Sequence, residues 1–420
     1  VIGASGVAAD ANPDDVLAPT GVSRQWGADF DGSYQVFVRF SEAMDRTTAQ
    51  APGAYRLNGL VAPQRASLSG NGQILELVFT GVAVSSTATL DIGVGSSVRD
   101  VNGLTLAELA GAVIAANAAD TTAPALVRAT HAEDFTGPGY RIDLLFSEAM
   151  SRADVEDPAG YEVNGVAAAA AVLASDAKTV ALTFQTPIAS TDEITVGAGG
   201  SVKDINGNAA AVTTVLADPN EADANAPTLV SRVWGADAAI YAVSVTFSES
   251  MDRTTSTTTT LYTLSTASGS AHPTVASLDN TGKVVTLTFA VTGSGLRRTE
   301  TLTVSGSVRD INGRSLASTA AAGVSANAAD TTPPAIASSA RVDAAHADVV
   351  FTEVLDKPSA EAAGYLIATG SVAGAVLQAD GRTVRLETDV DPAQLEVTVP
   401  VSIQDINGRS PAAPLVTTVP

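Results

Sequence analysis

The sequence has no cysteine among its 420 residues. Disulfide bonds, thiolate zinc sites and thiol catalysis are therefore all excluded. The absence is compatible with secretion, because domains of ordinary size do not need disulfides. Histidine is nearly absent as well: His131, His272 and His346 are the whole set, and they fall at unrelated positions of the repeat described below. A histidine-based metal or catalytic site is therefore not expected.

Positive charge and aromatic side chains are also scarce. The chain has 23 Lys+Arg against 45 Asp+Glu, which gives a formal net charge of -22. We expect no nucleic-acid partner, because phosphate binding needs a basic surface. Aromatic residues make up 5% and are mostly placed in strand cores, which leaves little for a sugar-stacking platform. No apolar run is long enough to cross a bilayer, so no membrane span is expected in this chain.

Catalytic motifs are missing too. The sequence has no Gly-x-Ser-x-Gly elbow and no phosphate-cradling loop. Carboxylate pairs are plentiful, so a glycosidase-like pair stays open on chemistry alone. An active site is normally built once, however, and every carboxylate candidate in this chain recurs. We therefore expect a protein that is not an enzyme.

What the sequence does have is internal repetition, with a period of about 105 residues, the usual size of one domain. Three phrases carry it. The first, Phe-Ser-Glu-x-Met or its variant, begins at Phe40, Phe146, Phe247 and Phe351. The second, Asp-x-Asn-Gly, begins at Asp100, Asp204, Asp310 and Asp405. The third, Asn-x-x-Asp-x-x-x-Pro, begins at Asn12, Asn117, Asn220 and Asn327 and marks short, stiff linkers.

The phrases divide the chain into four domains. Residues 1–11 align with residues 106–116, so 1–14 is interpreted as the last strand of a preceding repeat or as an N-terminal extension. The predicted domains are 15–119, 120–222, 223–329 and 330–420.

Within each repeat the apolar period is two, which is typical of β-strands. In the first repeat the pattern predicts seven strands: 22–26, 34–40, 54–57, 62–68, 74–79, 89–92 and 112–115. Seven short strands in about 100 residues predict an Ig-like β-sandwich. The fold class is therefore all-β, with tandem seven-stranded Ig-like sandwiches in an elongated array. The alanine-rich windows 167–171 and 360–363 are expected to be loops or edge segments, and the three methionines to plug the core.

Strand parity brings acidic residues together. If seven strands alternate in direction, the turn after strand two, the turn before strand seven and the incoming linker lie at the same end of the sandwich. Three carboxylates of each repeat should then converge there. The predicted sets are Asp15, Glu42 and Asp100; Asp120, Glu148 and Asp204; Asp223, Glu249 and Asp310; and Asp330, Glu353 and Asp405.

Clustered carboxylates repel one another unless a proton or a cation joins them. Calcium accepts 6–8 oxygen ligands with loose geometry, so Asn102 and backbone carbonyls could complete a shell. The hypothesis is one Ca²⁺ at each domain joint. A simpler interpretation stays open: the aspartates close Asx turns at Asn-Gly dipeptides, and the glutamates accept hydrogen bonds from their own loops.

The phrases F-S-E-x-M-D and V-x-D-x-N-G, separated by a tyrosine and two alternating strands, resemble the bacterial Ig-like domains of surface-layer proteins and large cell-surface adhesins. The resemblance implies an extracellular protein of the bacterial cell surface, part of a surface layer (S-layer), adhesin stalk or filament that self-associates. Two alternatives remain: a module that binds glycan or protein, with residues 265–272 as its most divergent loop, or an accessory region of a larger secreted enzyme.

Overall fold

The computed structural model describes residues 10–28, 33–133, 137–267, 269–290, 295–317, 320–362 and 364–420. They form two compact units. The first holds the described residues of Val1–Ala132, Arg141–Phe184 and Thr191–Asp218, and the second those of Glu133–Tyr140, Gln185–Ser190 and Pro219–Pro420. The predictions made on residues 1–9, 268 and 363 lie outside the described residues. Residues 10–14 form a turn and no strand. The domain boundaries stay predictions.

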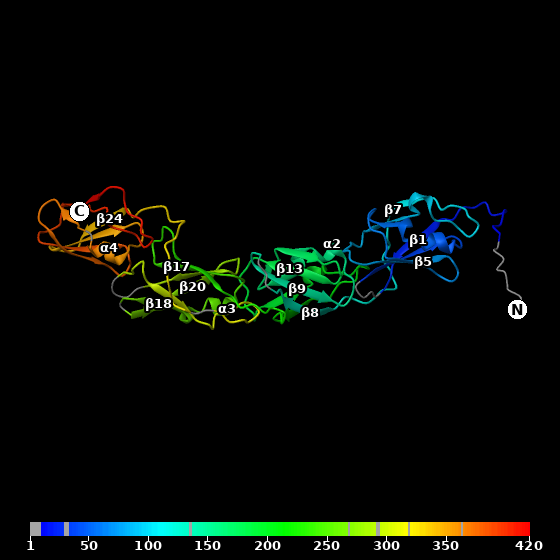
Figure 1. Cartoon of the computed structure of the whole chain (residues 1–420), viewed down its shortest axis with the longest axis horizontal. Coiled ribbons are helices and arrows are strands. Elements are labelled where there is room, and N and C mark those ends of the chain that lie inside the picture. The colour runs from blue at the N-terminus through cyan, green and yellow to red at the C-terminus, as the bar shows by residue number, and fades with distance from the viewer. Residues whose placement is uncertain are drawn as a thin grey trace. The chain divides into compact units, whose positions relative to one another are not determined.

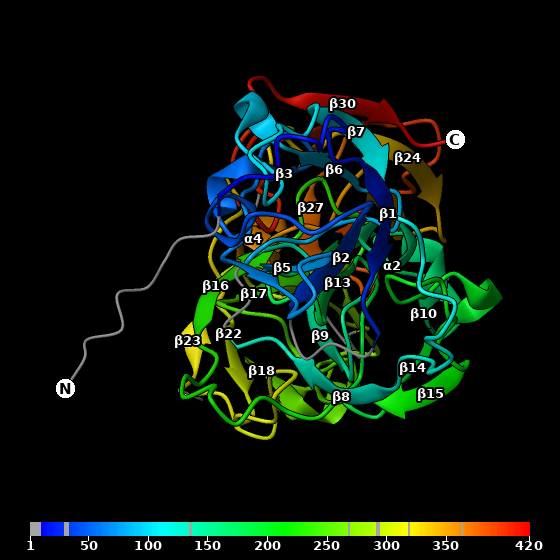
Figure 2. The ribbon, with the colours of Figure 1, turned by 90° about the vertical axis from the view of Figure 1, so that its right-hand side faces the viewer.

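Repeat one folds into two antiparallel sheets (Figures 1 and 2). One has the strand order β1-β2-β5-β4 and the other β3-β6-β7, which lie side by side in Figure 2. This is the four-plus-three arrangement of an Ig constant-type sandwich. Its strands are β1 Gly21–Trp26, β2 Tyr34–Phe40, β3 Tyr55–Leu57, β4 Arg65–Leu68, β5 Ile74–Phe79, β6 Thr89–Ile92 and β7 Leu109–Val113.

The other repeats have the same topology, and repeats two and three each add one strand. The added strands, β11 and β19, pair with the third strand of their sandwich, so the predicted count of seven holds for repeats one and four only. The strands of repeat two are β8 Leu126–His131, β9 Tyr140–Phe146, β10 Tyr161–Val163, β11 Val166–Ala167, β12 Ala170–Leu173, β13 Thr179–Phe184, β14 Glu193–Val196 and β15 Thr213–Leu216.

Repeats three and four complete the second unit. The strands of repeat three are β16 Leu229–Trp234, β17 Ala242–Phe247, β18 Tyr262–Thr266, β19 Gly269–Ala271, β20 Val275–Leu278, β21 Val284–Thr288, β22 Thr301–Val304 and β23 Ala322–Gly323. Those of repeat four are β24 Ile336–Arg341, β25 His346–Phe351, β26 Leu366–Ile367, β27 Val372–Leu377, β28 Thr383–Thr388, β29 Glu396–Val399 and β30 Leu415–Thr418.

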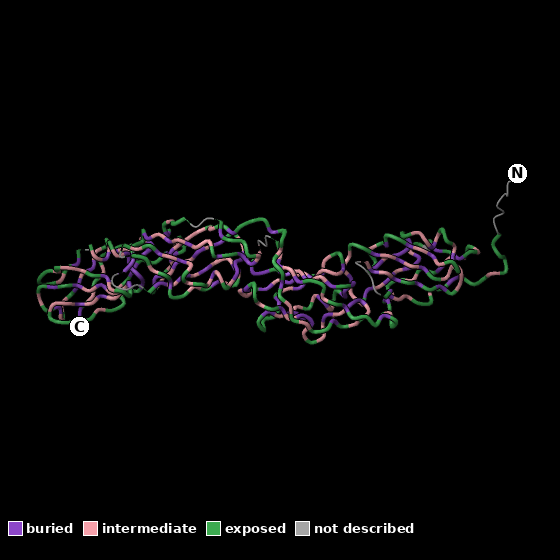
Figure 3. The backbone as a smooth tube through the Cα atoms, turned by 90° about the horizontal axis from the view of Figure 1, so that it is seen from below, coloured by how far each residue is buried: buried purple, intermediate pink, exposed green. Residues whose placement is uncertain are grey.

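Alternation of side chains builds each core. In β2 every second residue, from Tyr34 to Phe40, is buried between the sheets. Buried segments run through the interior of each repeat, and exposed segments cover its loops (Figure 3). All three methionines are buried, with at most 2% of the side chain exposed, so the prediction that they plug the core is confirmed. The sheets predicted from the period of two are thus explained by one-sided burial.

Each repeat also has a short α-helix that the apolar pattern did not predict. The helices are α1 Arg46–Ala49, α2 Arg152–Val155, α3 Arg253–Ser256 and α4 Lys357–Ala362, and 3-10 turns lie at η1 Pro52–Ala54, η2 Val94–Ser96, η3 Pro158–Gly160, η4 Ala198–Gly200 and η5 Thr259–Leu261. Residues 360–362 therefore end a helix, and the loop expected there was wrong. Of residues 167–171, Ala167 lies on β11 and 170–171 lie on β12, which are edge strands, and 168–169 connect them, so the expected loop or edge segment is confirmed.

Local hydrogen bonds explain these helices. Asp45 caps the start of α1, because its carboxylate accepts the Thr48 N–H at 2.8 Å. The Tyr55 hydroxyl then donates to the Ala49 carbonyl at 2.6 Å, which satisfies the last turn. The residue pairs Tyr161–Val155, Tyr262–Ser256 and Tyr365–Ala360 repeat this bond. Helices of one turn are too short to form without such tertiary support.

Within each unit, successive repeats meet through a second tyrosine. We call the end of a repeat that carries the linker and the Asp-x-Asn-Gly turn its acidic end, and the opposite end its far end. Tyr34, at the far end of repeat one, donates its hydroxyl to the Met150 carbonyl at the acidic end of repeat two, at 2.8 Å. The Val84 N–H donates to the same hydroxyl at 3.4 Å. A buried hydroxyl that both donates and accepts is fully satisfied, and it couples the two repeats.

Removing this hydroxyl should destabilise the first unit. The Tyr34→Phe variant keeps the ring but leaves the Met150 carbonyl without its donor, so we expect a loss of about 1–3 kcal/mol. Urea unfolding followed by the fluorescence of Trp26, in a Trp234→Phe background, measures it. The control Val113→Ala changes a side chain that is 59% exposed and should stay within about 0.5 kcal/mol of its parent. Equal midpoints for both variants would contradict the coupling.

Candidate metal centres

The predicted carboxylates do converge. In each of four clusters, one ligand oxygen per residue lies within 4.8 Å of the others. Three clusters match the predicted sets: Asp15–Glu42–Asp100, Asp120–Glu148–Asp204 and Asp223–Glu249–Asp310. The fourth contains Asp237, Asp330 and Glu353, so Asp237 stands where Asp405 was predicted.

Topology explains the convergence. Phe40 ends β2, and Glu42 lies two residues later, in the turn. Met44 pairs with Asp100 in an isolated antiparallel bridge, which ties the two turns together. The same bridge joins Met150 to Asp204, Met251 to Asp310 and Leu355 to Asp405. The bridge therefore sets the spacing of the carboxylates in all four repeats.

Each Asp-x-Asn-Gly aspartate divides its two oxygens between different tasks. One oxygen of Asp100 accepts the N–H groups of Asn102 and Leu104, at 2.8 and 2.9 Å, and so closes the turn. The other oxygen is buried and has no hydrogen-bond partner among the described residues. Asp310 and Asp405 repeat both features. The Asx-turn interpretation is therefore right for one oxygen only.

The Asn of the phrase holds the linker. The Asn102 side-chain oxygen accepts the Asn12 N–H at 2.9 Å, and its nitrogen donates to Asp15 at 2.5 Å. Asn206, Asn312 and Asn407 make the same pair of bonds to their own linkers. The suggestion that Asn102 supplies a cation ligand stays a prediction. The bonds themselves show that the residue positions the linker carboxylate.

Repeat two differs from the others at one residue. The second oxygen of Asp204 accepts a hydrogen from the Asn208 side chain at 2.8 Å, so it is satisfied within the protein. The corresponding position is Leu104 in repeat one and Arg314 in repeat three. Arg314 donates to the Asp223 carbonyl and leaves the second oxygen of Asp310 without a partner. The need for an external cation is therefore smallest in repeat two.

The fourth cluster has the strongest electrostatic strain. Burial and the negative charges of Asp405, Asp330 and Asp237 raise the pKa of Glu353 to about 8. Burial, with a further contribution from Asp330, raises the pKa of Asp405 to about 6. One oxygen of Asp330 is buried, and no described residue forms a hydrogen bond to it. Asp405 thus acts on the cluster by its charge, although Asp237 takes its predicted place.

Two other clusters show the same trend. Burial raises the pKa of Asp310 to about 6, and Asp223 adds to that effect. Burial, followed by the charges of Asp100 and Asp15, raises the pKa of Glu42. Like charges that share a buried site favour a shared proton or a bound cation.

The donor set fits a hard divalent cation. Oxygens bound to one Ca²⁺ at about 2.4 Å lie no more than about 4.8 Å apart, which the clustered oxygens satisfy. The ligands would come from carboxylates, the class that calcium prefers. The unpartnered oxygens of Asp100, Asp310, Asp330 and Asp405 are the groups that such an ion would satisfy.

Two functional features escaped the sequence argument. Asp237 follows β16 in the stretch Trp234-Gly235-Ala236-Asp237, and Trp26-Gly27-Ala28-Asp29 has the same pattern, with Asp29 outside the described residues. Tyr34, Tyr140 and Tyr241, which we call the joint tyrosines, each donate a hydroxyl hydrogen to a carbonyl of the following repeat. Each stands six residues before the phenylalanine of the Phe-Ser-Glu phrase. That fixed spacing was a signal that could have found them.

The sandwiches, their topology and their repetition define a tandem array of Ig-like domains. The profile of the bacterial Ig-like domain matches residues 120–217 and 223–326. These two stretches, repeats two and three, belong to the bacterial Ig-like domain family, and the resemblance seen in the sequence is thereby confirmed.

Solved structures were compared as well. The N-terminal part of the bacterial S-layer protein SbsC is 13% identical, covers 47% of this chain and 45% of its own, and gives a TM-score of 0.21. A longer piece of the same protein, rSbsC(31-844), is 14% identical with a TM-score of 0.20 and covers 96% of this chain and 54% of its own. The chain thus spans about half the length of these S-layer structures.

The Escherichia coli adhesin FdeC is 13% identical, with coverage of 98% of this chain and 99% of its own and a TM-score of 0.19. No curated protein matches the chain. In the described part of the chain, every helix is too short or too polar to span a membrane.

Stability without metal should depend on pH. Glu353 ordinarily titrates near 4.5 and does so at about 8 in the folded chain, so the native state binds its proton more tightly than the unfolded state. The resulting stabilisation is complete below pH 4.5 and is lost as the pH rises to about 8. In chelator, the melting temperature of the second unit should therefore fall across this window.

The Glu353→Gln variant tests the assignment. A neutral amide cannot titrate, so its melting temperature in chelator should change less between pH 5 and pH 8 than that of the parent chain. Parallel pH profiles for parent and variant would show that another group causes the dependence.

Proposed function

We propose that the chain is a non-enzymatic extracellular structural protein of the bacterial cell surface, in which Ca²⁺ ions at the acidic ends stiffen an array of Ig-like domains. The observation that carries this is one recurring arrangement: an Asp whose buried second oxygen has no partner among the described residues clusters with a Glu and a linker Asp, as in Asp100, Glu42 and Asp15. The proposal covers an S-layer unit, an adhesin stalk or a filament. Ig-like domains with S-layer and adhesin neighbours support its surface role.

A cation at an acidic end would act on the linker. The clustered carboxylates come from the linker (Asp15), the turn after the second strand (Glu42) and the turn before the seventh (Asp100). Bound Ca²⁺ supplies a positive charge that all three share and cancels their repulsion. The linker would then be fixed to the sandwich that follows it. In the fourth cluster, Asp237 of repeat three would join the fixed set, so the ion would also tie two repeats together.

The repetition of the clusters argues against catalysis. A carboxylate cluster lies at every acidic end, and such repetition suits a structural role along an array better than a single active site. Calcium suits these clusters better than magnesium, which demands near-ideal octahedral geometry and keeps more of its water.

Neutralising one aspartate should abolish the effect of calcium on repeat one. In the Asp100→Asn variant, the amide oxygen still accepts the N–H groups of Asn102 and Leu104, but the second position becomes a hydrogen donor. Calcium at a hundred times its dissociation constant should stabilise the parent by about 2.7 kcal/mol and the variant hardly at all. Urea unfolding of the Trp234→Phe background, read by Trp26 fluorescence with calcium or with chelator, measures the difference.

The matched control is Glu76→Gln, which removes a carboxylate that pairs with Arg65 and belongs to no cluster. It should keep the full calcium response. A parent chain whose stability is the same in calcium and in chelator would rule out the proposed cation.

The clusters should not bind equally. The second oxygen of Asp204 is already satisfied by Asn208, whereas those of Asp100, Asp310 and Asp405 are unpartnered. Calorimetric titration with calcium should therefore show a weaker site in repeat two than in the others. The Asn208→Leu variant, which copies Leu104 of repeat one, should strengthen that site. Four indistinguishable sites, unchanged by this substitution, would contradict the argument.

A further inference from the structure

The joints between repeats use one set of contacts. At the far end, a tyrosine hydroxyl donates to the carbonyl of the residue in the Met position of the following repeat: Tyr34 to Met150, Tyr140 to Met251 and Tyr241 to Leu355, at 2.8, 2.7 and 2.9 Å. The members of the last two pairs all belong to the second compact unit.

A far-end loop supplies a second contact. Its carbonyl accepts the N–H of the first helix residue of the following repeat: Val84 from Arg152, Ile188 from Arg253 and Leu296 from Lys357, each at 2.8–2.9 Å. Where the far end has a tryptophan, its ring packs against the joint tyrosine. The ring centroids of Trp26 and Tyr34 are 5.9 Å apart, and those of Trp234 and Tyr241 are 6.4 Å apart. The Trp234 indole N–H also donates to the same loop, at the Arg298 carbonyl, at 3.2 Å.

Repeat one has the receiving half of this joint without an occupant among the described residues. No described residue donates to the Met44 carbonyl or accepts the Arg46 N–H, the two groups that joints use in the other repeats. Val101 is 61% exposed, whereas its equivalents Ile205, Ile311 and Ile406 are 2%, 7% and 2% exposed.

A hollow lies over these groups. Its volume is about 400 Å³, and its lining includes Met44, Arg46, Leu68, Gly72 and Val101. Gly72 has the position at which Gly282 and Gly381 contact tyrosine rings: a Cβ built on those glycines would lie 2.7 Å from Tyr140 and 2.4 Å from Tyr241. The hollow in repeat one therefore has the same glycine as the acidic ends of repeats three and four, whereas repeat two has Ala177 at this position. We call it the socket.

The far end of repeat four lacks the side chains that the other far ends contribute to a joint. Ala345 stands where the other repeats have the joint tyrosine. The Thr388 N–H donates to the Ala345 carbonyl, just as the Phe289 N–H donates to the Tyr241 carbonyl in repeat three. Arg341 takes the place of Trp26 and Trp234 at the end of the first strand. Asp391 takes the place of Val84, Ile188 and Leu296, five residues before the sixth strand.

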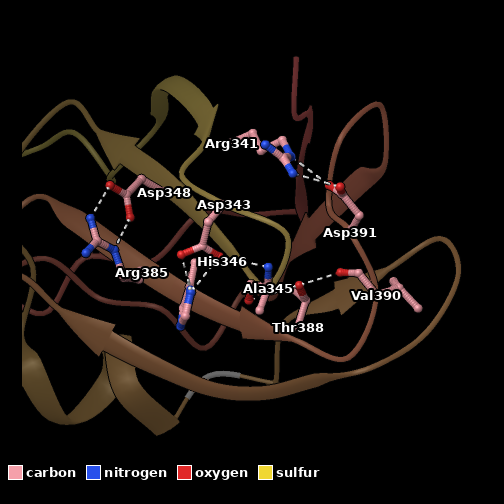
Figure 4. A network of polar contacts seen from close by, with 9 residues as sticks. All are labelled: Arg341, Asp343, Ala345, His346, Asp348, Arg385, Thr388, Val390 and Asp391. Carbon is pink, nitrogen blue, oxygen red and sulfur yellow. Dashed lines mark hydrogen bonds and ion pairs between the residues drawn. The ribbon is translucent and has the colours of Figure 1, made fainter.

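These replacements satisfy one another (Figure 4). The Arg341 guanidinium donates to both oxygens of Asp391, at 2.7 and 2.8 Å. Asp391 also accepts the Ala393 N–H at 3.1 Å. The residues equivalent to Ala393 in repeats one and three are Ser86 and Arg298, and their N–H groups donate instead to the following repeat. The far end of repeat four is thus closed on itself by an ion pair, with no phenol to donate.

We propose that the socket of repeat one docks the far end of an Ig-like repeat that carries a joint tyrosine and an apolar loop, as repeats one to three do. The tyrosine hydroxyl binds the Met44 carbonyl, the loop carbonyl accepts the Arg46 N–H, and the apolar loop residue covers Val101. A second copy of this chain does not dock through repeat four, because its far end lacks these groups.

The full-length chain can test this if its own far end is rebuilt. The Arg341→Trp/Ala345→Tyr/Asp391→Leu variant restores the tryptophan, tyrosine and apolar residue of repeat three. Since the socket and the rebuilt end are different surfaces, the contact is heterologous, and the variant should form chains or rings. Sedimentation should show that the mean mass of the variant rises to about twice that of the natural chain, or more, at the same concentration.

Two substitutions locate the contact. Val101→Glu, added to the rebuilt variant, should return the mass to that of one chain, whereas Val113→Glu, an equally exposed valine outside the socket, should not. If the triple variant loses its folded circular dichroism spectrum, the Ala345→Tyr/Asp391→Leu variant replaces it. A folded rebuilt variant that does not associate, or whose association is unaffected by Val101→Glu, overturns the proposal. The proposal is also overturned if the natural chain associates and Val101→Glu abolishes that association. The far end of repeat four, with its Arg341–Asp391 ion pair, would then be the occupant of the socket.

Discussion

The structure of each repeat depends on how a buried carboxylate divides its two oxygens. One oxygen of Asp100 holds the turn before the seventh strand, and the other is buried with no partner in the described part of the chain. Burial of an unsatisfied charged oxygen is costly unless another group compensates for it. The linker and the glutamate bring further negative charge to the same place instead of relief. A shared proton or a bound cation would supply the partner that this oxygen of Asp100 lacks, as the Asn208 amide does for Asp204 in repeat two.

The Phe-Ser-Glu-x-Met phrase recurs because its consecutive residues serve separate tasks. In repeat two, Phe146 fills the core, Glu148 joins the cluster, and Met150 is buried while its carbonyl accepts the joint hydrogen bond. The Met150–Asp204 bridge binds the cluster turn to the joint. Any shift of this bridge would move the acidic end and the joint together, so the two features are mechanically linked. In repeat four Leu355 replaces Met, and the carbonyl still accepts Tyr241, because the contact is made by the backbone.

The sequence predicts most of the fold because one-sided burial imposes a period of two, and β2, β5 and β6 have the predicted bounds. The convergence of Asp15, Glu42 and Asp100 also follows from strand parity, which needs only a count of reversals. What escaped prediction depends on contacts between distant segments. The one-turn helix α1 exists through Asp45 and Tyr55, and Asp237 enters the fourth cluster from the preceding repeat. Neither leaves a periodic signal within its own segment.

The two ends of a repeat differ in what they demand of a neighbour. The acidic end offers backbone groups, a carbonyl and an N–H, so its receiving function survives changes of side chain such as Met251 to Leu355. The far end depends on side chains, and three substitutions in repeat four replace its phenol and apolar loop with an ion pair. Docking through the far end can therefore be switched off by few changes. At the acidic end the carbonyl and the N–H persist as long as the fold does, and only apolar contacts such as that of Val101 are open to substitution. Evolution of such an array should vary the far ends and keep the acidic ends.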